Sequence, residues 1–325
     1  MSKELRENLS KEIVNQLSLG FKPWEPDWSV SSARAVSVMS PLNPTTGKRY
    51  RGGNRVVLGM VALARGYTDS RWMTFNQAKK LEVSVKKGEK GTTIEYWSFT
   101  KSVKTDETDP ATGKPVYVNK KLDRPCPFYA TVFNAQQMTS MPEVIVPDLK
   151  IHSNDAIEAM VAASGAVLEF GMRDVPCYIP SQDLISMPAK ESFHDTEGYY
   201  ATLLHEMAHW TKASGRMDRD MKTYAAEELV AELTSVYLCS DFGVSYKLDK
   251  HVSYIGDWME AIDNDKNVFF RAAAEAEKSS DYLMQFTNNP DYVPMNEIDL
   301  SDFTFDFDSI SSLMDEEETF SISPK

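Results

Sequence analysis

The chain has 325 residues, of which 42% are hydrophobic and 11% aromatic, and its formal net charge is −13. This hydrophobic content can fill real cores, which excludes a chain that is disordered throughout. The longest nearly apolar run, residues 56–64, is too short to span a bilayer. Because the first residues form a polar helical pattern without the apolar region of a signal peptide, we expect a soluble cytoplasmic protein with no membrane partner.

The charge is segregated along the chain. Through Ser140, 22 Lys and Arg stand against 13 Asp and Glu, whereas the remainder has 13 basic and 35 acidic residues. This asymmetry predicts two domains, the first of which faces a polyanion, although a solvated basic face would have the same composition. The three cysteines lie far apart, and their odd number favours reduced, buried thiols over a disulfide framework.

The first 140 residues predict an α+β domain. Apolar residues recur at helical spacing through residues 2–19, which indicates an amphipathic helix. A buried helix is predicted over residues 53–67. A short helix capped by Thr74 leads into a basic glycine turn and then a strand.

Turn chemistry predicts a hairpin later in this domain. The segment DPATGKPVY, residues 109–117, combines Asp-Pro with a glycine that can take the left-handed conformation. It joins predicted strands over residues 95–103 and 114–120. Residues 127–134 read as a further strand.

The rest of the chain predicts a mainly helical domain with a small sheet. Residues 141–149 contain two prolines and little periodicity, so we place a linker at residues 141–150 and the second domain at residues 151–298. Residues 299–325 are acidic with scattered aromatics and predict a loosely ordered tail. Within the second domain we expect helices over 153–164, 199–214, 223–243, 251–262 and 267–286, and strands over 166–170 and 175–180.

The segment LLHEMAHW, residues 203–210, contains an HExxH motif. Residues four apart lie on one face of a helix, so His205 and His209 can direct both imidazoles at one ion. Glu206 lies beside them and can accept a proton from a water activated there. The apolar neighbours indicate a buried helix, in which unpaired imidazoles would be costly. The motif therefore predicts a Zn²⁺ site with Glu206 as the catalytic base; two core histidines satisfied by hydrogen bonds are the alternative.

A zinc hydrolase needs a third protein ligand, and the next predicted helix offers one. Glu228 and Glu232 lie four apart on one face of that helix. Together with the HExxH residues they resemble the glutamate-type zincins. The resemblance implies Glu228 as the third ligand and Glu232 as the outer acceptor for an imidazole N–H. Glu227 is the rival ligand, and a solvated acidic stripe is the structural alternative.

The basic half mixes cations with aromatic residues, which favours single-stranded nucleic acid because a base must be unpaired to stack. We expect Trp72 and Trp97 to pack in the core, and Tyr50, which lies between basic residues, to be the best stacking candidate. The candidate DNA-binding residues are Lys48, Arg49, Tyr50, Arg51, Arg55, Arg71, Lys86, Lys87 and Lys90.

Three long segments in order resemble the ArdC-type antirestriction proteins of plasmids and phages. They are YRGGNRVVLGMVALARGY, RWMTFNQAKKLEVSVKKGEKGTTIEYW and YYATLLHEMAHWTKASGRMDR. The resemblance covers about residues 5 to 240. It implies an N-terminal domain that binds single-stranded DNA, a C-terminal zincin-like metallopeptidase domain, and protection of mobile-element DNA from host restriction.

Two other functions fit the same residues. One is an intracellular zinc metalloprotease whose basic half recognises a protein substrate. The other is a non-catalytic DNA-coating protein with a structural metal. Both leave His205, His209 and Glu228 around the ion, but they differ in whether DNA binds and whether Glu206 is needed.

Overall fold

The structure, a computed structural model, describes residues 2–19, 22, 24, 38–108, 113, 115–142, 153–173, 175–246 and 255–287. These residues belong to one compact unit within residues 1–289. Most of the expected linker and all of the expected acidic tail lie outside the described residues, so both stay predictions.

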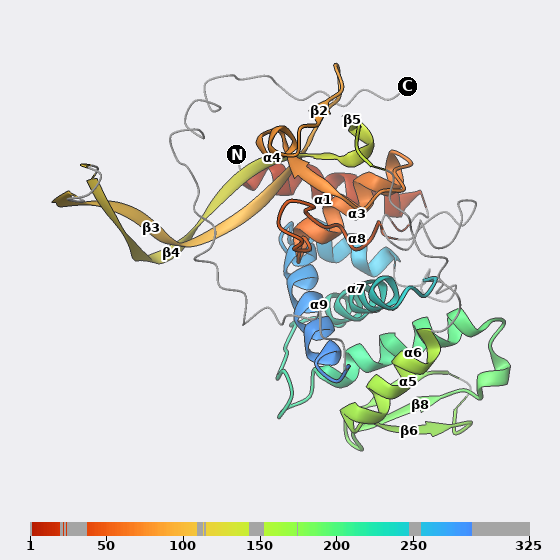
Figure 1. The fold of residues 1–325 in the computed structure, drawn as a ribbon. Helices are drawn as coiled ribbons and strands as arrows, with labels where there is room; N and C mark the ends of the chain where they lie inside the picture. Colours follow the sequence, from red (N-terminus) through yellow and green to blue (C-terminus); the bar gives the residue numbers. More distant parts are fainter. Residues whose placement is uncertain are drawn as a thin grey trace. The chain divides into compact units, whose positions relative to one another are not determined.

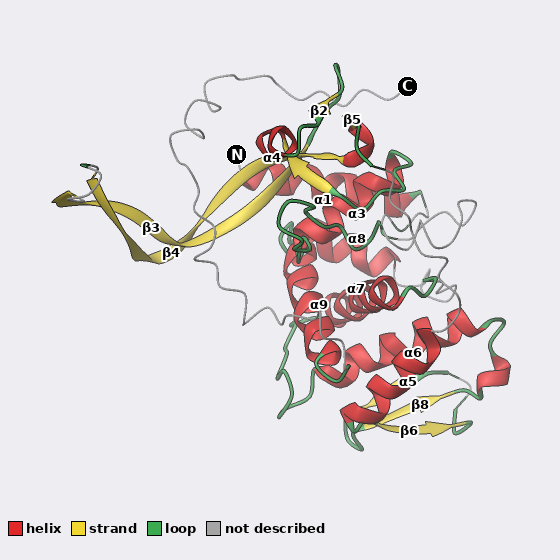
Figure 2. Ribbon diagram, viewed as in Figure 1, coloured by secondary structure: helices red, strands yellow, loops and turns green. Residues whose placement is uncertain are grey.

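The N-terminal part combines helices with an antiparallel sheet, as the sequence predicted (Figures 1 and 2). The sheet has the order β1-β4-β3, and a separate pair is formed by β2 and β5. The side chain of Thr74 accepts from the backbone N–H of Gln77 and begins α4 with a capping box. The elements are α1 (Ser2–Ser18), α3 (Gly53–Ala64), β1 (Trp72–Thr74), α4 (Phe75–Lys80), β2 (Ser84–Val85), β3 (Thr92–Thr108), β4 (Pro115–Asn134), the 3-10 turn η1 (Ala135–Gln137) and β5 (Met138–Thr139).

The expected hairpin is confirmed, and it is longer than predicted. The strand expected at residues 127–134 is the continuation of β4, which pairs with β3 in register from Thr92↔Val132 outward to Thr108↔Pro115. Buried Leu58, Trp72 and Val132 join α3, β1 and β4 in one core cluster. Trp97, expected in the core, is 44% exposed on β3, so that prediction was wrong.

The C-terminal part is mainly helical with one small sheet, again as predicted. Its sheet has the order β6-β8-β7, in which β8 is parallel to β6 and antiparallel to β7. The sequence did not predict β8, because its four consecutive buried residues show no alternation. The elements are α5 (Ser153–Ser164), β6 (Val167–Phe170), β7 (Cys177–Ile179), β8 (Leu184–Met187), the 3-10 turn η2 (Lys190–Ser192), α6 (Thr196–Thr211), α7 (Tyr224–Phe242), α8 (Ile255–Asn264) and α9 (Val268–Met284).

Two buried helices, α6 and α7, carry the predicted site, and both have defined ends. The side chain of Asp195 caps α6, and that of Thr223 caps α7. Helix α7 ends at Gly243, whose φ of 69° is the left-handed conformation that glycine adopts without strain. Helix α6 packs against α7 and α9 and against the strands of the small sheet. The helical core thus holds the HExxH residues at a fixed distance from the glutamates of α7.

A buried ion cluster joins the N-terminal part to the helical part. Arg55 of α3 is 2% exposed, and its Nη2 donates to Asp241 Oδ1 at 2.8 Å and to the carbonyl of Tyr237 at 3.0 Å. The backbone N–H of Gly52 donates to Glu277 Oε2 at 2.9 Å. Buried charges are stable only when they are paired and hydrogen-bonded, so these contacts fix α3 against α7 and α9.

Two further expectations concern cysteines and the membrane. All three cysteines are free, but Cys126 is exposed on β4 rather than buried. Among the described residues, every helix is too short or too polar to cross a bilayer.

Candidate metal centre

Three buried side chains from two helices converge at the predicted metal site. His205 and His209 come from α6, and Glu228 comes from α7. The two histidine Nε2 atoms lie 3.2 Å apart. One carboxylate oxygen of Glu228 lies 3.4 Å from Nε2 of His209, and the other lies 3.5 Å from Nε2 of His205. Each of the three residues is less than a tenth exposed.

This arrangement fits a divalent cation. Two atoms that each lie 2.0–2.1 Å from a tetrahedral zinc ion are about 3.3 Å from one another, which is close to the separations seen here. Two imidazole nitrogens and one carboxylate oxygen are also the donor set of catalytic zinc sites, which leave a position for water. The three residues therefore fit a metal that keeps an open coordination position.

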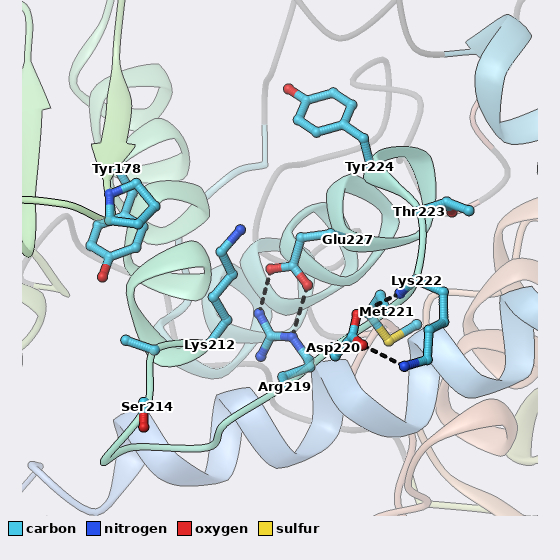
Figure 3. A pocket seen from close by; sticks show the side chains of 12 residues that line it. Tyr178, Lys212, Ser214, Arg219, Asp220, Met221, Lys222, Thr223, Tyr224 and Glu227 are labelled. Atoms are coloured by element: carbon cyan, nitrogen blue, oxygen red, sulfur yellow. Dashed lines mark hydrogen bonds and ion pairs between the residues drawn. The ribbon is translucent and has the colours of Figure 1, made fainter.

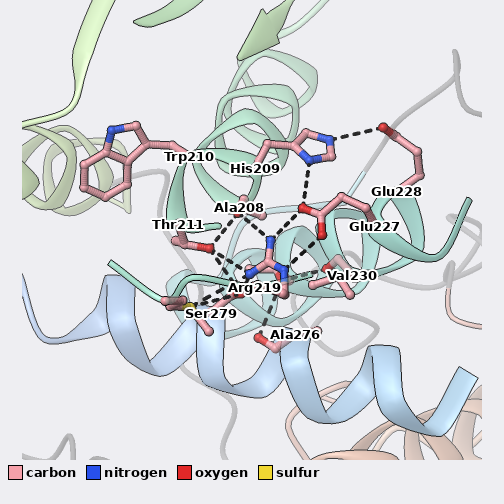
Figure 4. Close-up of polar contacts among 12 residues, drawn as sticks. Ala208, His209, Trp210, Thr211, Arg219, Glu227, Glu228, Val230, Ala276 and Ser279 are labelled. Atoms are coloured by element: carbon pink, nitrogen blue, oxygen red, sulfur yellow. Dashed lines mark hydrogen bonds and ion pairs between the residues drawn. The ribbon is translucent and has the colours of Figure 1, made fainter. Parts of the chain in front are cut away.

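Glu227 holds the outer side of His209. Its Oε1 lies 3.3 Å from His209 Nδ1, so an Nδ1–H donates to the carboxylate and leaves Nε2 directed at Glu228 (Figure 4). Arg219 clamps the same carboxylate through Nε at 3.0 Å and Nη2 at 2.7 Å. Its Nη1 donates to Ser279 at 2.6 Å, which anchors the clamp on α9.

Electrostatics among these side chains are dominated by the carboxylates. Burial disfavours the charged imidazole of His209, but hydrogen bonds to Glu227 and Glu228 outweigh burial and raise its pKa to about 9. Burial raises the pKa of Glu227, but hydrogen bonds from His209 and Arg219 bring it down to about 2. The pKa of Glu228 is likewise lowered by the two histidines against the effect of burial. Both glutamates therefore stay ionised at neutral pH, ready to balance a cation.

Two other predicted site residues lie on the same helices. Glu206 is 6% exposed, next to His205 on α6, and its charge is close enough to contribute to the raised pKa of His209. Glu232 is fully buried one turn beyond Glu228 on α7, where it accepts from Lys22 Nζ at 3.4 Å and from Trp24 Nε1 at 3.3 Å. The outer acceptor seen at His209 is thus Glu227, a residue that the sequence offered only as a rival ligand.

A cavity of about 480 Å³ opens beside Glu227 and Arg219. Arg219 and Glu227 line one part of it, and Lys212, Lys222 and Tyr224 line another (Figure 3). Tyr224 is 64% exposed, whereas Lys222 is paired with Asp220. The cavity gives solvent a route to the side of α7 that carries Glu227.

The predicted DNA-binding residues fall into two groups. Arg49 and Arg55 pair with Asp241, and Arg51 pairs with Asp281 of α9. Tyr50 is 6% exposed, and its hydroxyl donates to the carbonyl of Trp72 at 3.0 Å. In this conformation these side chains hold the protein together.

Arg49 is itself exposed, as are most of the remaining candidates. Arg71 is half-buried and pairs with Asp69 at 2.7 Å. Lys86 donates to the carbonyl of Gln136 at 2.8 Å, although the residue as a whole is exposed. The exposed lysines of the predicted set are Lys48, Lys86, Lys87 and Lys90.

Sequence reasoning did not find Arg219 or the role of Glu227. Arg219 lies in the loop between α6 and α7, where no motif marks it. A signal was present for Glu227: it directly precedes the predicted ligand in a first helical turn. Because adjacent residues on a helix point about 100° apart, neighbouring glutamates can contact a ligand histidine and the metal separately.

Two family models match the chain in the order of its two parts. Residues 3–133 match the N-terminal domain of the anti-restriction factor ArdC, and residues 155–275 match a zincin-like metallopeptidase, MPTase-PolyVal. The antirestriction ArdC protein from the R388 plasmid is 34% identical, and its metal-free crystal structure matches 87% of this chain and 97% of that chain with a TM-score of 0.70. The chain belongs to the ArdC family of antirestriction proteins.

Two further comparisons bear on the family's setting. A Mn(II)-bound structure of the R388 protein is 32% identical and matches 88% of this chain and 98% of that one, with a TM-score of 0.66. A DNA primase TraC from Escherichia coli is 39% identical over 298 residues. That alignment covers 88% of this chain but only 27% of TraC, so the chain spans about a quarter of that relative.

Proposed function

We propose that this ArdC-family protein binds single-stranded DNA through its N-terminal part, carries a zinc peptidase-like site in its helical part, and protects mobile-element DNA from host restriction. The observation that carries the proposal is the convergence of His205, His209 and Glu228 beside Glu206. The names of the relatives, an antirestriction protein of a plasmid and a DNA primase, support the DNA half.

The residues around the site fit peptide hydrolysis. A divalent cation held by the two histidines and Glu228 would supply Lewis acidity to a substrate carbonyl and to water. Glu206 is the general base of this proposal: its carboxylate takes up a proton and returns it to the leaving amine. Glu227 and Arg219 keep the His209 ring in one orientation, so the open side of the site does not have to reorganise during the reaction.

Zinc is the metal we propose, because two imidazoles and one carboxylate form a typical zinc donor set. The R388 relative has been crystallised with Mn(II), so manganese is the competing ion. Elemental analysis of protein purified without added metal separates the two. A stoichiometric zinc content supports the proposal, and a stoichiometric manganese content would replace zinc by manganese in it.

The DNA half of the proposal starts from exposed cations. Lys48, Lys86, Lys87 and Lys90 lie on the surface of the N-terminal part, where they can contact phosphates. Binding of this kind weakens steeply as the salt concentration rises. A gel-shift series with single-stranded and duplex DNA at several salt concentrations tests it. If neither DNA binds, the protein is better described as a metalloprotease whose basic half recognises protein.

Glu206→Gln distinguishes a catalytic metal site from a structural one. The amide keeps the shape of the side chain and leaves all three metal ligands intact, so we expect the variant to bind zinc like the parent. We expect it to lose any peptidase activity and, with it, protection of incoming DNA. If protection survives in a variant that binds zinc and cleaves nothing, the metal is structural and the protein acts by coating DNA.

A further inference from the structure

The outer half of the β3–β4 hairpin is a free ribbon. Near its base, β1 pairs with residues 132–134 of β4, and Asn54 of α3 bonds both backbone groups of Glu95, at 2.7 and 3.0 Å. Farther out, between Thr100↔Lys121 and Lys104↔Tyr117, the described residues provide no third strand (Figure 1). An isolated two-stranded ribbon is marginally stable in water. A bound partner would therefore stabilise the outer half.

One face of this outer ribbon carries an unfavourable charge pair. Lys101 lies directly opposite Lys120, and the next rung on the same face is Val103 opposite Val118. Like charges directly opposite each other destabilise a hairpin, and the described residues place no acidic ion-pair partner on either lysine. The pairing is costly in the isolated chain and becomes favourable when an anion lies between the two ammonium groups.

The same face is apolar next to its lysines. Phe99 lies on β3 two residues before Lys101, where the pairing with β4 shifts register between Ser98 and Thr100, and its ring is 51% exposed. Val103 and Val118 are 37% and 49% exposed. We call the face formed by Lys101, Val103, Val118 and Lys120, together with the adjacent Phe99, the ribbon face. A partner that suits this face carries several negative charges and also has flat apolar groups that can contact these side chains.

We infer that the ribbon face binds single-stranded DNA, with Phe99 stacked on an unpaired base and the Lys101–Lys120 rung astride the phosphate backbone. This inference rests on the proposed function and adds a binding site outside the nine residues that the sequence predicted. Duplex DNA fits less well. A β-ribbon can enter a major groove, but base edges there are read by hydrogen bonds, and the ribbon face offers apolar side chains where donors would be needed.

The opposite face of the same ribbon supplies matched controls. Tyr117 is 60% exposed and lies on the side of Lys121, across the strand from the ribbon face. Phe99→Ala and Tyr117→Ala each remove one exposed ring from the ribbon. The double lysine variant combines Lys101→Ala with Lys120→Ala. Lys121→Ala, which removes one lysine from the opposite face, is its charge control.

The experiment measures the affinity of the full-length protein for a fluorescent mixed-sequence single-stranded oligonucleotide by anisotropy. Loss of one stacked base should weaken binding about 5- to 150-fold in Phe99→Ala, with little change in Tyr117→Ala. In the double lysine variant, the slope of log affinity against log salt should become shallower by about 1.4, because each phosphate contact on a single strand contributes about 0.7. Circular dichroism verifies that each variant is folded.

Several outcomes overturn the inference, and they are distinguishable. If the parent protein does not bind single-stranded DNA, the proposed function itself fails. If the parent binds and the ribbon-face variants behave like their controls, the function stands and DNA binds elsewhere. If duplex binds more tightly and shows the same losses, the partner is duplex DNA. If the variants change the oligomeric state in light scattering and leave DNA binding intact, the ribbon face joins two copies of this chain.

Discussion

Replacing Glu227 by Gln should weaken zinc binding although Glu227 is not a proposed ligand. Its carboxylate lies 3.3 Å from His209 Nδ1 and is held by two bonds from Arg219. A neutral amide accepts a weaker hydrogen bond from the imidazole and loses the ion pair with the guanidinium. Loss of such an outer partner typically reduces metal affinity 10- to 100-fold, about 1.4–2.7 kcal/mol of binding free energy. We expect the upper part of this range because Glu227 is only 7% exposed.

The assay is a competition titration of zinc between the metal-free protein and a chromogenic chelator at fixed pH. Glu232→Gln is the matched control, since Glu232 is on the same helix and fully buried. Its carboxylate accepts from Lys22 and Trp24, so its replacement should lower stability and leave zinc affinity close to that of the parent. If Glu232→Gln loses more affinity than Glu227→Gln, the outer acceptor is Glu232, and the assignment of Glu227 is refuted.

The buried ion cluster and the metal centre can also be tested through stability and pH. Arg55→Met removes the buried cation of the cluster and leaves Asp241 and Glu277 only their pairs with the more exposed Arg49 and Arg51. Urea unfolding of the metal-free protein should therefore show a loss of up to about 3–5 kcal/mol, against less than about 1 kcal/mol for Arg271→Ala at an exposed pair. Similar losses in the two variants would contradict the buried cluster. The pKa of His209 is raised to about 9 without metal, so zinc must displace a proton from His209 at neutral pH. The affinity for zinc should therefore rise about tenfold per pH unit from pH 7 until about pH 9. A zinc affinity that does not change above pH 7 would show that the pKa of this histidine is not raised. Zinc at about 100 times its Kd should raise the free energy of unfolding by about 2.7 kcal/mol, and a chelator should reverse this gain. Equal stability with and without zinc in denaturant titrations would argue against a preformed site.

The stability of the metal-free protein should also depend on pH through His209. A histidine whose pKa is raised on folding adds stability that is fully present below its unfolded value, near 6.5, and is lost as the pH rises through about 9. Without metal, the contribution of His209 should therefore fade between about pH 6.5 and 9. With saturating zinc, His209 is neutral in both the bound and the unfolded protein over this range, so its contribution to stability should be nearly independent of pH.

The sequence predicted the helices and the position of His205 and His209 on one helix face because those features are local. His205 and His209 share a face by helical periodicity alone, and the capping box of Thr74 involves only residues within one helical turn. The predicted helices were all found, with ends differing by a few residues. Strand β8 was missed because a short buried run carries no periodic signal.

The remaining assignments depend on how distant segments pack. Which glutamate of α7 contacts a histidine is set by the rotation of α7 against α6, and three acidic residues within six positions leave that rotation open. Glu232 is buried beside Lys22 and Trp24, more than 200 positions away in the chain. Arg55 and Tyr50 look like DNA contacts in the sequence because interior ion pairs and nucleic-acid surfaces use the same residue types. Only the packed structure separates the two uses.

We propose that one cation lies between His205, His209 and Glu228. Crystals of the full-length protein grown with zinc, measured on both sides of the zinc absorption edge, test it directly. We expect one anomalous peak within bonding distance of both Nε2 atoms and a Glu228 oxygen, with His209 Nδ1 still hydrogen-bonded to Glu227. A peak bound by Glu227 or Glu232 instead, or none at the two histidines, would contradict it.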